Sequence, residues 1–300
     1  MQVSRVNNFT IQDKRCYKQA NVSPAFTSVG GSISDAAGKF MYRIDTSFFR
    51  FDMPWGVFAK FIAERFNKAP KVNVIDHACS IGYEPYSIAM ALKTTVGAQA
   101  KKFFPIKARD IDANNIRLAK EGFFKVDDYE KMGVDFYTKH RFPEFFKIDP
   151  TNVFTKIYRP TEQIKSTVEF KQSNILNDLR KIAKKNTVLL CRNFWPYLEA
   201  KDAANLAEKL ATKMRKNSLL VIGEYDKSFR INKMLESFGF KETDIEGVFE
   251  VPGRGRQTRK TAKLAKEKFL SSTPEGQICK DFNDLNTAVK FDMQEYIANY

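Results

Sequence analysis

The stretch from Val72 to Leu92, VNVIDHACSIGYEPYSIAMAL, constrains the fold more than any other part of this chain. Apolar, β-branched residues over 72–77 predict a buried strand. Glu84 and Pro85 suit the first turn of a helix, which we expect over 84–96. A strand, a short loop and a helix is how open α/β sheets hold nucleotide-like cofactors, although the same order also occurs in ordinary connections.

The loop between this strand and helix is built from small residues. Ala78, Ser80 and Gly82 stand at alternate positions, so the backbone can approach a ligand closely. A dinucleotide site needs G-x-G-x-x-G to cradle a pyrophosphate, and this loop has one glycine. Glu84 would also repel a phosphate, whereas it would attract a sulfonium or an ammonium group. S-adenosylmethionine (SAM) therefore fits the loop better than NAD.

From residue 71 onward, short apolar strands alternate with amphipathic helices, which predicts a parallel sheet with helices on both faces. The expected strands are 72–77, 104–110, 167–172, 187–192 and 218–224, and the expected helices are 84–96, 113–121, 177–185, 200–215 and 227–238. Phe240–Thr243 and Gly247–Val251 predict a closing hairpin, which would put an antiparallel strand into the sheet. Doubly wound dehydrogenases normally lack that hairpin.

Three segments lie outside this alternation. Residues 1–40 are mixed and polar, and we interpret them as an N-terminal arm or small cap. Residues 125–166 form an aromatic, basic insert within a domain that spans 41–252. Residues 253–300 form a basic C-terminal extension, with seven Lys or Arg against one Glu within 254–268.

A further helix is expected before the first strand, where Asp52 would cap it with Pro54 in its first turn.

The overall charge favours an acidic partner. The net charge is +15, which suits nucleic acid, an anionic membrane surface or an acidic protein, although charge runs are more often simply solvated. No stretch is apolar and long enough to span a bilayer, and no secretory leader is visible. Four separated cysteines and two histidines make a zinc or iron–sulfur site unlikely, so no metal is expected. These features favour a reduced, cytoplasmic protein.

Polar residues at the carboxyl ends of two further predicted strands are candidates for ligand binding. Asp110 can bind the hydroxyls of a ribose, whereas Asp112 can instead cap the helix that follows. Polar and aromatic residues at 190–198 end the fourth strand.

Four separated motifs resemble those of the CheR family of chemotaxis receptor methyltransferases. They are Thr46-x-Phe48-Phe49-Arg50, the CSIGYEPYSIA segment at 79–89, Asp110-Ile111-Asp112 with its downstream AKEG, and Cys191-Arg192-Asn193 with Tyr197. Asn174-Ile175-Leu176 also stands where that family has N-L-L. The resemblance runs from about residue 42 to residue 225.

The resemblance implies a class I SAM-dependent methyltransferase fold, Rossmann-like and doubly wound, with a seven-stranded sheet. It also implies the family's reaction, the esterification of glutamate side chains on chemoreceptors. Residues that would line the SAM site by position are Thr46, Arg50, Ala78, Glu84, Asp110, Asn174, Ile175, Arg192 and Asn193, to which the loop adds Ser80 and Gly82. Arg50 and Tyr197 would flank the transferable methyl group as the catalytic pair.

The chain departs from the family pattern at positions that concern the acceptor. Ile44 replaces the usual asparagine, and Tyr83 replaces the first of two adjacent acids. The insert at 125–166 lacks the glycine-bearing loop with which some members dock a receptor tail. An acidic, receptor-like protein remains the expected acceptor.

Two other functions remain open at this point. Asn193-Phe194-Trp195-Pro196-Tyr197 resembles the D/N-P-P-Y loop of nucleic-acid methyltransferases, with shifted spacing and without the first proline. The basic surface or tail would suit a nucleic acid. The chain could also be a non-catalytic SAM-binding module, although retention of Arg50, Glu84, Asp110 and Tyr197 argues against that.

Overall fold

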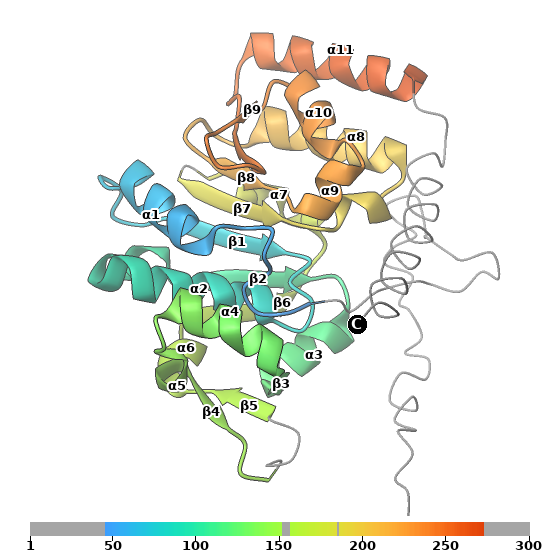
Figure 1. Ribbon diagram of the computed structural model, residues 1–300. Helices are drawn as coiled ribbons and strands as arrows, with labels where there is room; N and C mark the ends of the chain where they lie inside the picture. Colours follow the sequence, from blue (N-terminus) through green and yellow to red (C-terminus); the bar gives the residue numbers. More distant parts are fainter. Residues whose placement is uncertain (1–45, 152–156, 185, 273–300) are drawn as a thin grey trace, which may run out of the picture.

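The computed structural model describes residues 46–151, 157–184 and 186–272, which form a sheet covered by helices on both faces (Figure 1). The seven strands run in the order β6 (Val168–Gln172), β2 (Ile106–Asp110), β1 (Asn73–His77), β7 (Thr187–Cys191), β8 (Leu219–Val221), β10 (Val248–Glu250) and β9 (Lys241–Glu242). Pairs from β6 to β8 are parallel, and β10 pairs antiparallel with both β8 and β9. The predicted doubly wound sheet with its closing hairpin is confirmed.

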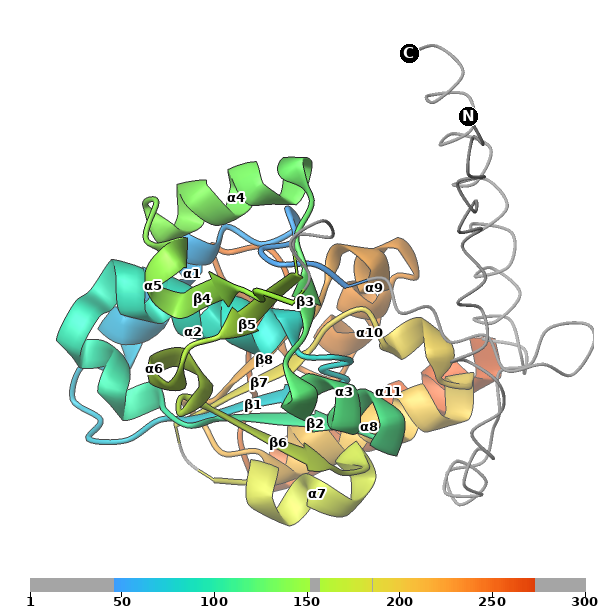
Figure 2. The ribbon, with the colours of Figure 1, turned by 90° about the horizontal axis from the view of Figure 1, so that it is seen from below.

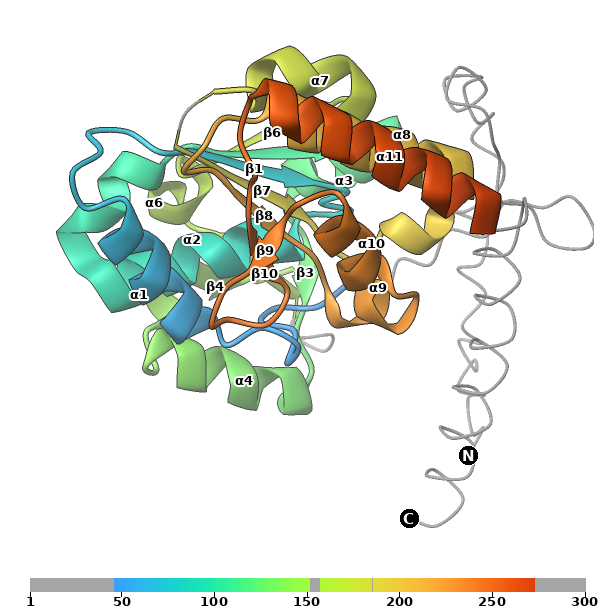
Figure 3. The ribbon, with the colours of Figure 1, turned by 90° about the horizontal axis from the view of Figure 1, so that it is seen from above.

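Helices divide between the two faces of the sheet, as Figure 3 shows from above. One face carries α1 (Trp55–Arg65), α2 (Tyr83–Val96), the 3-10 helix η3 (Gly97–Phe103) and α3 (Ala113–Glu121). The other carries α7 (Ile175–Ile182), α8 (Ala200–Lys213) and α11 (Arg256–Ser272), with α9 (Glu224–Ser228) and α10 (Ile231–Ser237) beside them. A short 3-10 turn, η5 (Trp195–Tyr197), follows β7.

The insert folds as a small α/β unit against α2 (Figure 2). Its antiparallel sheet has the order β3 (Phe124–Lys125), β5 (Ile157–Pro160) and β4 (Phe146–Ile148). The helices of the unit are α4 (Asp128–Thr138), α5 (Phe142–Phe145) and α6 (Glu162–Lys165). Phe124, Phe145 and Phe146 are buried in the same core as α1 and α2, so the insert is an integral part of that core.

Strand alternation separates two cores. Val74 and Leu190 point to the side of α1 and α2, which we call the aromatic face because Phe, Tyr and Trp dominate its buried residues. Ile75 and Leu189 point to the side of α7, α8 and α11, which we call the alanine face because α8 contributes five buried alanines to it. These small side chains lie in the helix that packs along α11.

Two local predictions were wrong. Asp52 does not cap α1, because the helix begins after Pro54 with no side-chain cap and Asp52 instead pairs with Arg192. The helix expected over 227–238 is broken into α9 and α10, because Arg230 adopts a left-handed conformation with φ 58°.

The structure describes residues 253–272 of the basic extension, of which 256–272 form helix α11, packed along α8 with Ala262 buried. The predicted N-terminal arm lies outside the described residues. None of the described helices is long and apolar enough to cross a membrane.

Candidate cofactor site

The loop after β1 is shaped by residues with positive φ. Ala78 and Ser80 have φ of 62° and 50°, and Gly82 begins α2 with φ 101°. A Cβ at Gly82 would lie 2.9 Å from the ring of Phe170, so only glycine fits both the conformation and the space. The small residues predicted for this loop therefore let it turn tightly against β6.

Asp110 at the end of β2 holds this loop in place. Its carboxylate accepts hydrogen bonds from the backbone N–H of Ser80, at 2.8 Å, and of Asp112, at 2.9 Å. Burial raises the pKa of Asp110, and these backbone donors oppose that rise. Asp112 caps α3 by accepting from Asn114 N at 2.7 Å, which leaves Asp110 as the ribose candidate.

An apolar cavity opens at the carboxyl ends of β1, β2 and β6. Four of the predicted cofactor residues line it: Ala78, Asp110, Asn174 and Ile175. The remaining lining residues were not predicted: His77, Ile111, Ser173, Leu176, Phe194, Leu198, Asp202 and Leu206. Asn174 also caps α7, since its side chain accepts from Leu176 N at 2.9 Å.

His77 was considered in the sequence only as a metal ligand, yet it lines this cavity. The side chain is 3% exposed, and its Nε2 has no hydrogen-bond partner among the described residues. Burial lowers the pKa of His77 to about 4, so the imidazole is neutral at physiological pH. A buried nitrogen without a partner costs free energy, so this atom is suited to hydrogen-bond a ligand.

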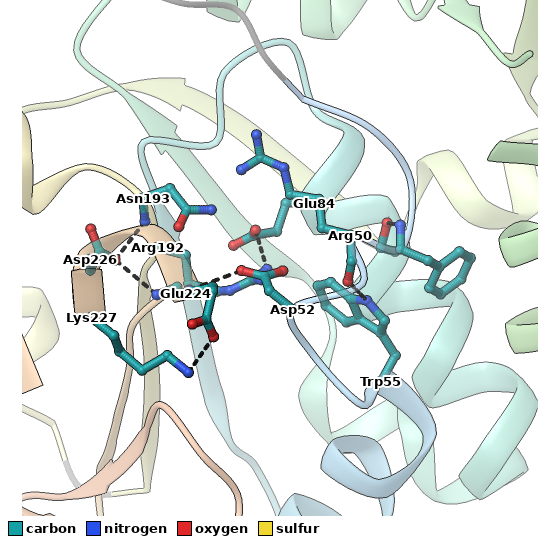
Figure 4. Close-up of polar contacts among 12 residues, drawn as sticks. Arg50, Asp52, Trp55, Glu84, Arg192, Asn193, Glu224, Asp226 and Lys227 are labelled. Atoms are coloured by element: carbon teal, nitrogen blue, oxygen red, sulfur yellow. Dashed lines mark hydrogen bonds and ion pairs between the residues drawn. The ribbon is translucent and has the colours of Figure 1, made fainter. Parts of the chain in front are cut away.

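Beside the cavity, a buried ion network surrounds Arg192 (Figure 4). The Arg192 side chain is 0% exposed and binds Glu84 through Nη1, at 2.5 Å, and Asp52 through Nη2. Asp52 also accepts from the backbone N–H of Glu224 at 3.1 Å. The guanidinium lies 5.1 Å from the centre of the Trp55 ring. Arg192 therefore joins α2, the segment before α1 and the loop after β8.

Arg50 stands at the edge of this network. Its backbone carbonyl accepts from Trp55 Nε1 at 2.9 Å, which fixes the segment before α1 (Figure 4). Burial raises the pKa of Glu84, while the charges of Arg192 and Arg50 act in the opposite direction. Beneath Glu84, burial and the Glu84 charge raise the pKa of Asp76 well above its usual range. The network thus concentrates acidic groups at the start of α2.

Asn193 lies in a turn that is fixed by hydrogen bonds to the Asp226 carboxylate. The buried Asp226 carboxylate accepts from the backbone N–H groups of Asn193, at 2.6 Å, of Gly223, at 2.8 Å, and of Trp195, at 3.2 Å. The Asn193 Oδ1 is buried against Gly223, where a Cβ would approach it to 1.9 Å. Gly223 is the N-cap of α9 and Asp226 stands at N3, so that contact is local, whereas the contacts with Asn193 and Trp195 join a distant loop and had no signal in the sequence.

Three of the remaining predicted residues lie in segments that adjoin these two regions. Thr46 and Arg50 are partly buried in the segment before α1, and Tyr197 is partly buried in η5. Two groups of predicted residues result. Ala78, Asp110, Asn174 and Ile175 line the cavity, and Glu84 pairs with Arg192 beside it.

Comparison with known proteins identifies the family. A model described as "CheR methyltransferase, SAM binding domain" matches residues 45–243. The chain belongs to the CheR methyltransferase family. The predicted resemblance and the predicted cofactor, SAM, are both confirmed by this match.

Curated relatives of this CheR-family chain are distant. A chemotaxis protein methyltransferase of Borreliella burgdorferi is 30% identical over 168 residues, covering 55% of this chain and 56% of that protein. Chemotaxis protein methyltransferase 2 of Pseudomonas aeruginosa is 27% identical over 197 residues, covering 65% and 67% respectively. The chain thus spans between about half and two thirds of these relatives.

Among solved structures, PKMT2 from Rickettsia typhi in complex with AdoHcy is 16% identical, covers 82% of this chain and 38% of that one, and has a TM-score of 0.32. The fold assignment therefore rests on the strand order of the CheR-family domain itself.

The residues present fit SAM. The apolar walls of the cavity suit an adenine ring, and the unpaired His77 Nε2 suits one of its polar edge atoms. Asp110 borders the cavity as a carboxylate with further lone pairs for ribose hydroxyls. Glu84, at the start of α2, suits an ammonium group.

Proposed function

We propose that the protein is a SAM-dependent methyltransferase that esterifies carboxylate side chains of a protein, most specifically glutamates. The observation that carries this proposal is the convergence of the family motifs. Segments around residues 46–52, 78–84, 110 and 190–197 are distant in sequence but meet at one edge of the sheet, around the cavity and Arg192.

The cofactor would be held in two parts by the two groups of residues. Ile175 and Phe194 would pack against the adenine, and Asp110 would bind the ribose. Glu84 would bind the ammonium, and Arg192 is a positioning residue because its buried guanidinium fixes the Glu84 carboxylate. When bound, SAM supplies a methyl group activated by a positive sulfonium.

The acceptor chemistry requires positioning rather than a strong base. A glutamate is already ionised at neutral pH, since its ordinary pKa is about 4.3. Arg50 would orient the acceptor carboxylate through charge-assisted hydrogen bonds, and Tyr197 would hold it in line with the methyl group. Alignment of this kind can be worth about 7–11 kcal/mol in an activation barrier. Exclusion of water around the carboxylate adds to its reactivity.

The nucleic-acid alternative finds little support in the loop that suggested it. An amino-methyltransferase needs the Asn side chain of that loop to accept a hydrogen bond from the target amine. In this protein the Asn193 Oδ1 is buried against Gly223, where a nucleobase has no access. The basic charge of the chain therefore needs another explanation than this site.

We propose an acidic, receptor-like protein as the acceptor, in keeping with the names of the curated relatives. Three large apolar side chains are exposed near Arg50, namely Phe51 beside it and Met132 and Phe136 on α4. Their positions make the insert the part of the chain that an acceptor would meet beside Arg50. The cytoplasmic location of the protein remains a prediction.

A methyl-transfer assay tests this function. Purified protein is incubated with methyl-labelled SAM and host-cell lysate, and acceptors are identified by mass spectrometry. We expect label on glutamate side chains that base treatment releases as methanol. Base-stable label in RNA or DNA would favour a nucleic-acid methyltransferase, and SAM binding without any transfer would favour a non-catalytic module.

A further inference from the structure

A groove between α10 and α11 is separate from the cofactor site. Its floor is apolar, with Met234, Leu264 and Phe269, and Leu264 is 67% exposed. Its volume of about 970 Å³ suits a peptide segment better than a small ion. A long exposed apolar groove of this kind usually has an occupant.

The rim of this groove carries positive charge. Arg230 and Lys233 stand on one wall and Lys268 on the other, and all three are exposed. No Asp or Glu is among the described residues that line the groove. An occupant with an apolar side and an acidic edge would complement both features.

The chain itself continues from one end of the groove. Ser272, the last residue of α11, lines it, and residues 273–300 follow directly. Pro274 and Gly276 favour a turn at that point. Connections of about 2–8 residues commonly join antiparallel helices, so a return along the groove needs no long linker.

The sequence of this following segment has the chemistry that the groove demands. At 3.6 residues per turn, six of its large apolar residues fall on one stripe, whereas Phe291 and Ile297 fall outside it. The stripe consists of Ile278, Phe282, Leu285, Val289, Met293 and Tyr296. Four acids fall along one edge of that stripe, namely Asp281, Asp284, Asp292 and Glu295. Residues 273–300 hold five acids against two lysines, in contrast to the strongly basic chain as a whole.

We propose that residues 277–300 bind in the groove between α10 and α11 of the same chain. The apolar stripe would cover Leu264 and Phe269, and the acidic edge would face the wall that carries Arg230 and Lys233. As a helix, residues 278–296 would extend about 27 Å, which exceeds the roughly 16 Å from Thr261 to Ser272 along α11. The basic run at 254–268 would then serve in part as an internal docking surface.

Site-directed photo-crosslinking in the full-length protein tests this proposal. A benzophenone amino acid replaces Leu264, an exposed position where the change leaves the core intact. We expect crosslinks within single chains, and peptide mapping should locate them between residues 278 and 296. The matched control carries the same amino acid at Lys263, which is 75% exposed and does not line the groove, and it should give far fewer.

Charge reversal separates specific docking from random encounter. Arg230→Glu with Lys233→Glu should lower the crosslinking yield at Leu264 by about two- to tenfold, as expected for two exposed ion pairs. Adding Asp281→Lys with Glu295→Lys should restore it. An unchanged yield would overturn the proposal.

Other mapped products would also overturn it. Crosslinked dimers would assign the groove to a second copy, and crosslinks into an added acidic amphipathic peptide in preference to 278–296 would assign it to a partner protein. Absence of any crosslink would mean that the segment lies elsewhere. None of these outcomes depends on methyl transfer, so this proposal and the proposed function can fail independently.

Discussion

The two faces of the sheet are covered by side chains of different size. On the aromatic face, Phe124 meets the rings of Phe48, Tyr83, Tyr86 and Phe146 at centroid distances of 5.0–5.5 Å. On the alanine face, five alanines of α8 are buried, and α8 packs along α11.

At the carboxyl ends of the strands, the two faces also contribute different parts of the site. The cavity proposed for adenine lies on the alanine side, where Leu198 and Leu206 of the α8 region form a wall. The segment bearing Arg50 lies on the aromatic side, where Phe48 and Phe49 anchor it in the core. One face thus shapes a slot for the cofactor, and the other fixes the residues proposed to hold the acceptor. Arg192 is where the two faces meet.

Arg192→Ala should have the largest effect, because it leaves the carboxylates of Glu84 and Asp52 buried without their partner. We expect a loss of about 3–5 kcal/mol in the free energy of unfolding, and loss of SAM binding. Urea denaturation and calorimetric titration measure the two effects. Arg65→Ala, which breaks a more exposed pair with Glu250, should cost about 1 kcal/mol or less. Equal losses would show that the Arg192 network is an ordinary surface feature.

Opposite changes of side-chain size should destabilise the two faces. Phe124→Ala on the aromatic face creates a cavity and should cost about 3–5 kcal/mol. Ala207→Leu on the alanine face overpacks the α8 contact and should cost about 1–3 kcal/mol. Thermal and urea unfolding test both variants. If Ala207→Leu were neutral, the small size of the buried α8 side chains would have no energetic meaning.

Arg50→Ala should reduce methyl transfer with little effect on folding, because its guanidinium stands at the edge of the site. Loss of a charge-assisted hydrogen bond of about 1.5–3 kcal/mol corresponds to roughly 10- to 150-fold in kcat/KM. Tyr197→Phe should show a smaller loss. Kinetics with an identified acceptor provide the measurement. Full activity in both variants would remove these residues from the proposed catalytic pair.

His77→Ala should weaken SAM binding by about two- to tenfold, the value of one neutral hydrogen bond. Nitrogen NMR of the imidazoles offers a direct check, because the chain has only two histidines. The Nε2 signal of His77 should shift when S-adenosylhomocysteine is added, whereas that of the exposed His140 should not. If the Nε2 signal of His77 did not shift, His77 would be excluded from the cofactor site.

Glu130 of α4 should give the smallest effect, a pH dependence of stability on the aromatic face. It accepts from Phe48 N, and burial together with Asp127 raises its pKa from 4.5 to about 7. Folding therefore favours the protonated form, so its stabilisation is full below pH 4.5 and is lost as pH rises through 7.

Partial exposure limits this contribution to about 1 kcal/mol. Glu130→Gln removes the titrating group. The free energy of unfolding, measured in urea at pH 5 and pH 7.5, should therefore differ less between the two pH values for the variant than for the wild type. A parallel pH response of both proteins would contradict this assignment.

Much of the fold could be predicted because its signals are local. Runs of β-branched residues, alternating with amphipathic segments, gave strand positions within a few residues, and the closing hairpin followed from two short apolar runs around a turn. The loop after β1 was recognisable because small residues are required where the backbone turns at positive φ. Requirements of this kind restrict the residue type at the same position, so the sequence reveals them.

The site was predictable only in part, because several of its interactions join distant segments. Asp52 has the local signature of a helix cap, but Arg192 lies 140 residues away in sequence and binds it. Asp226 acts on backbone groups of another loop, so neither its type nor its spacing revealed it. His77 has an unpaired nitrogen only because the fold buries its side chain where no described polar group reaches Nε2.

The sequence by itself determined the order of elements, the small-residue loop and the membership in the CheR family, since these depend on residue type and spacing along the chain. The tertiary structure decided which charges pair, which polar atoms are left without a partner, and which groove the basic helix forms. Those outcomes depend on burial, because the free energy of a charge or a hydrogen-bonding group changes most when water is removed from around it.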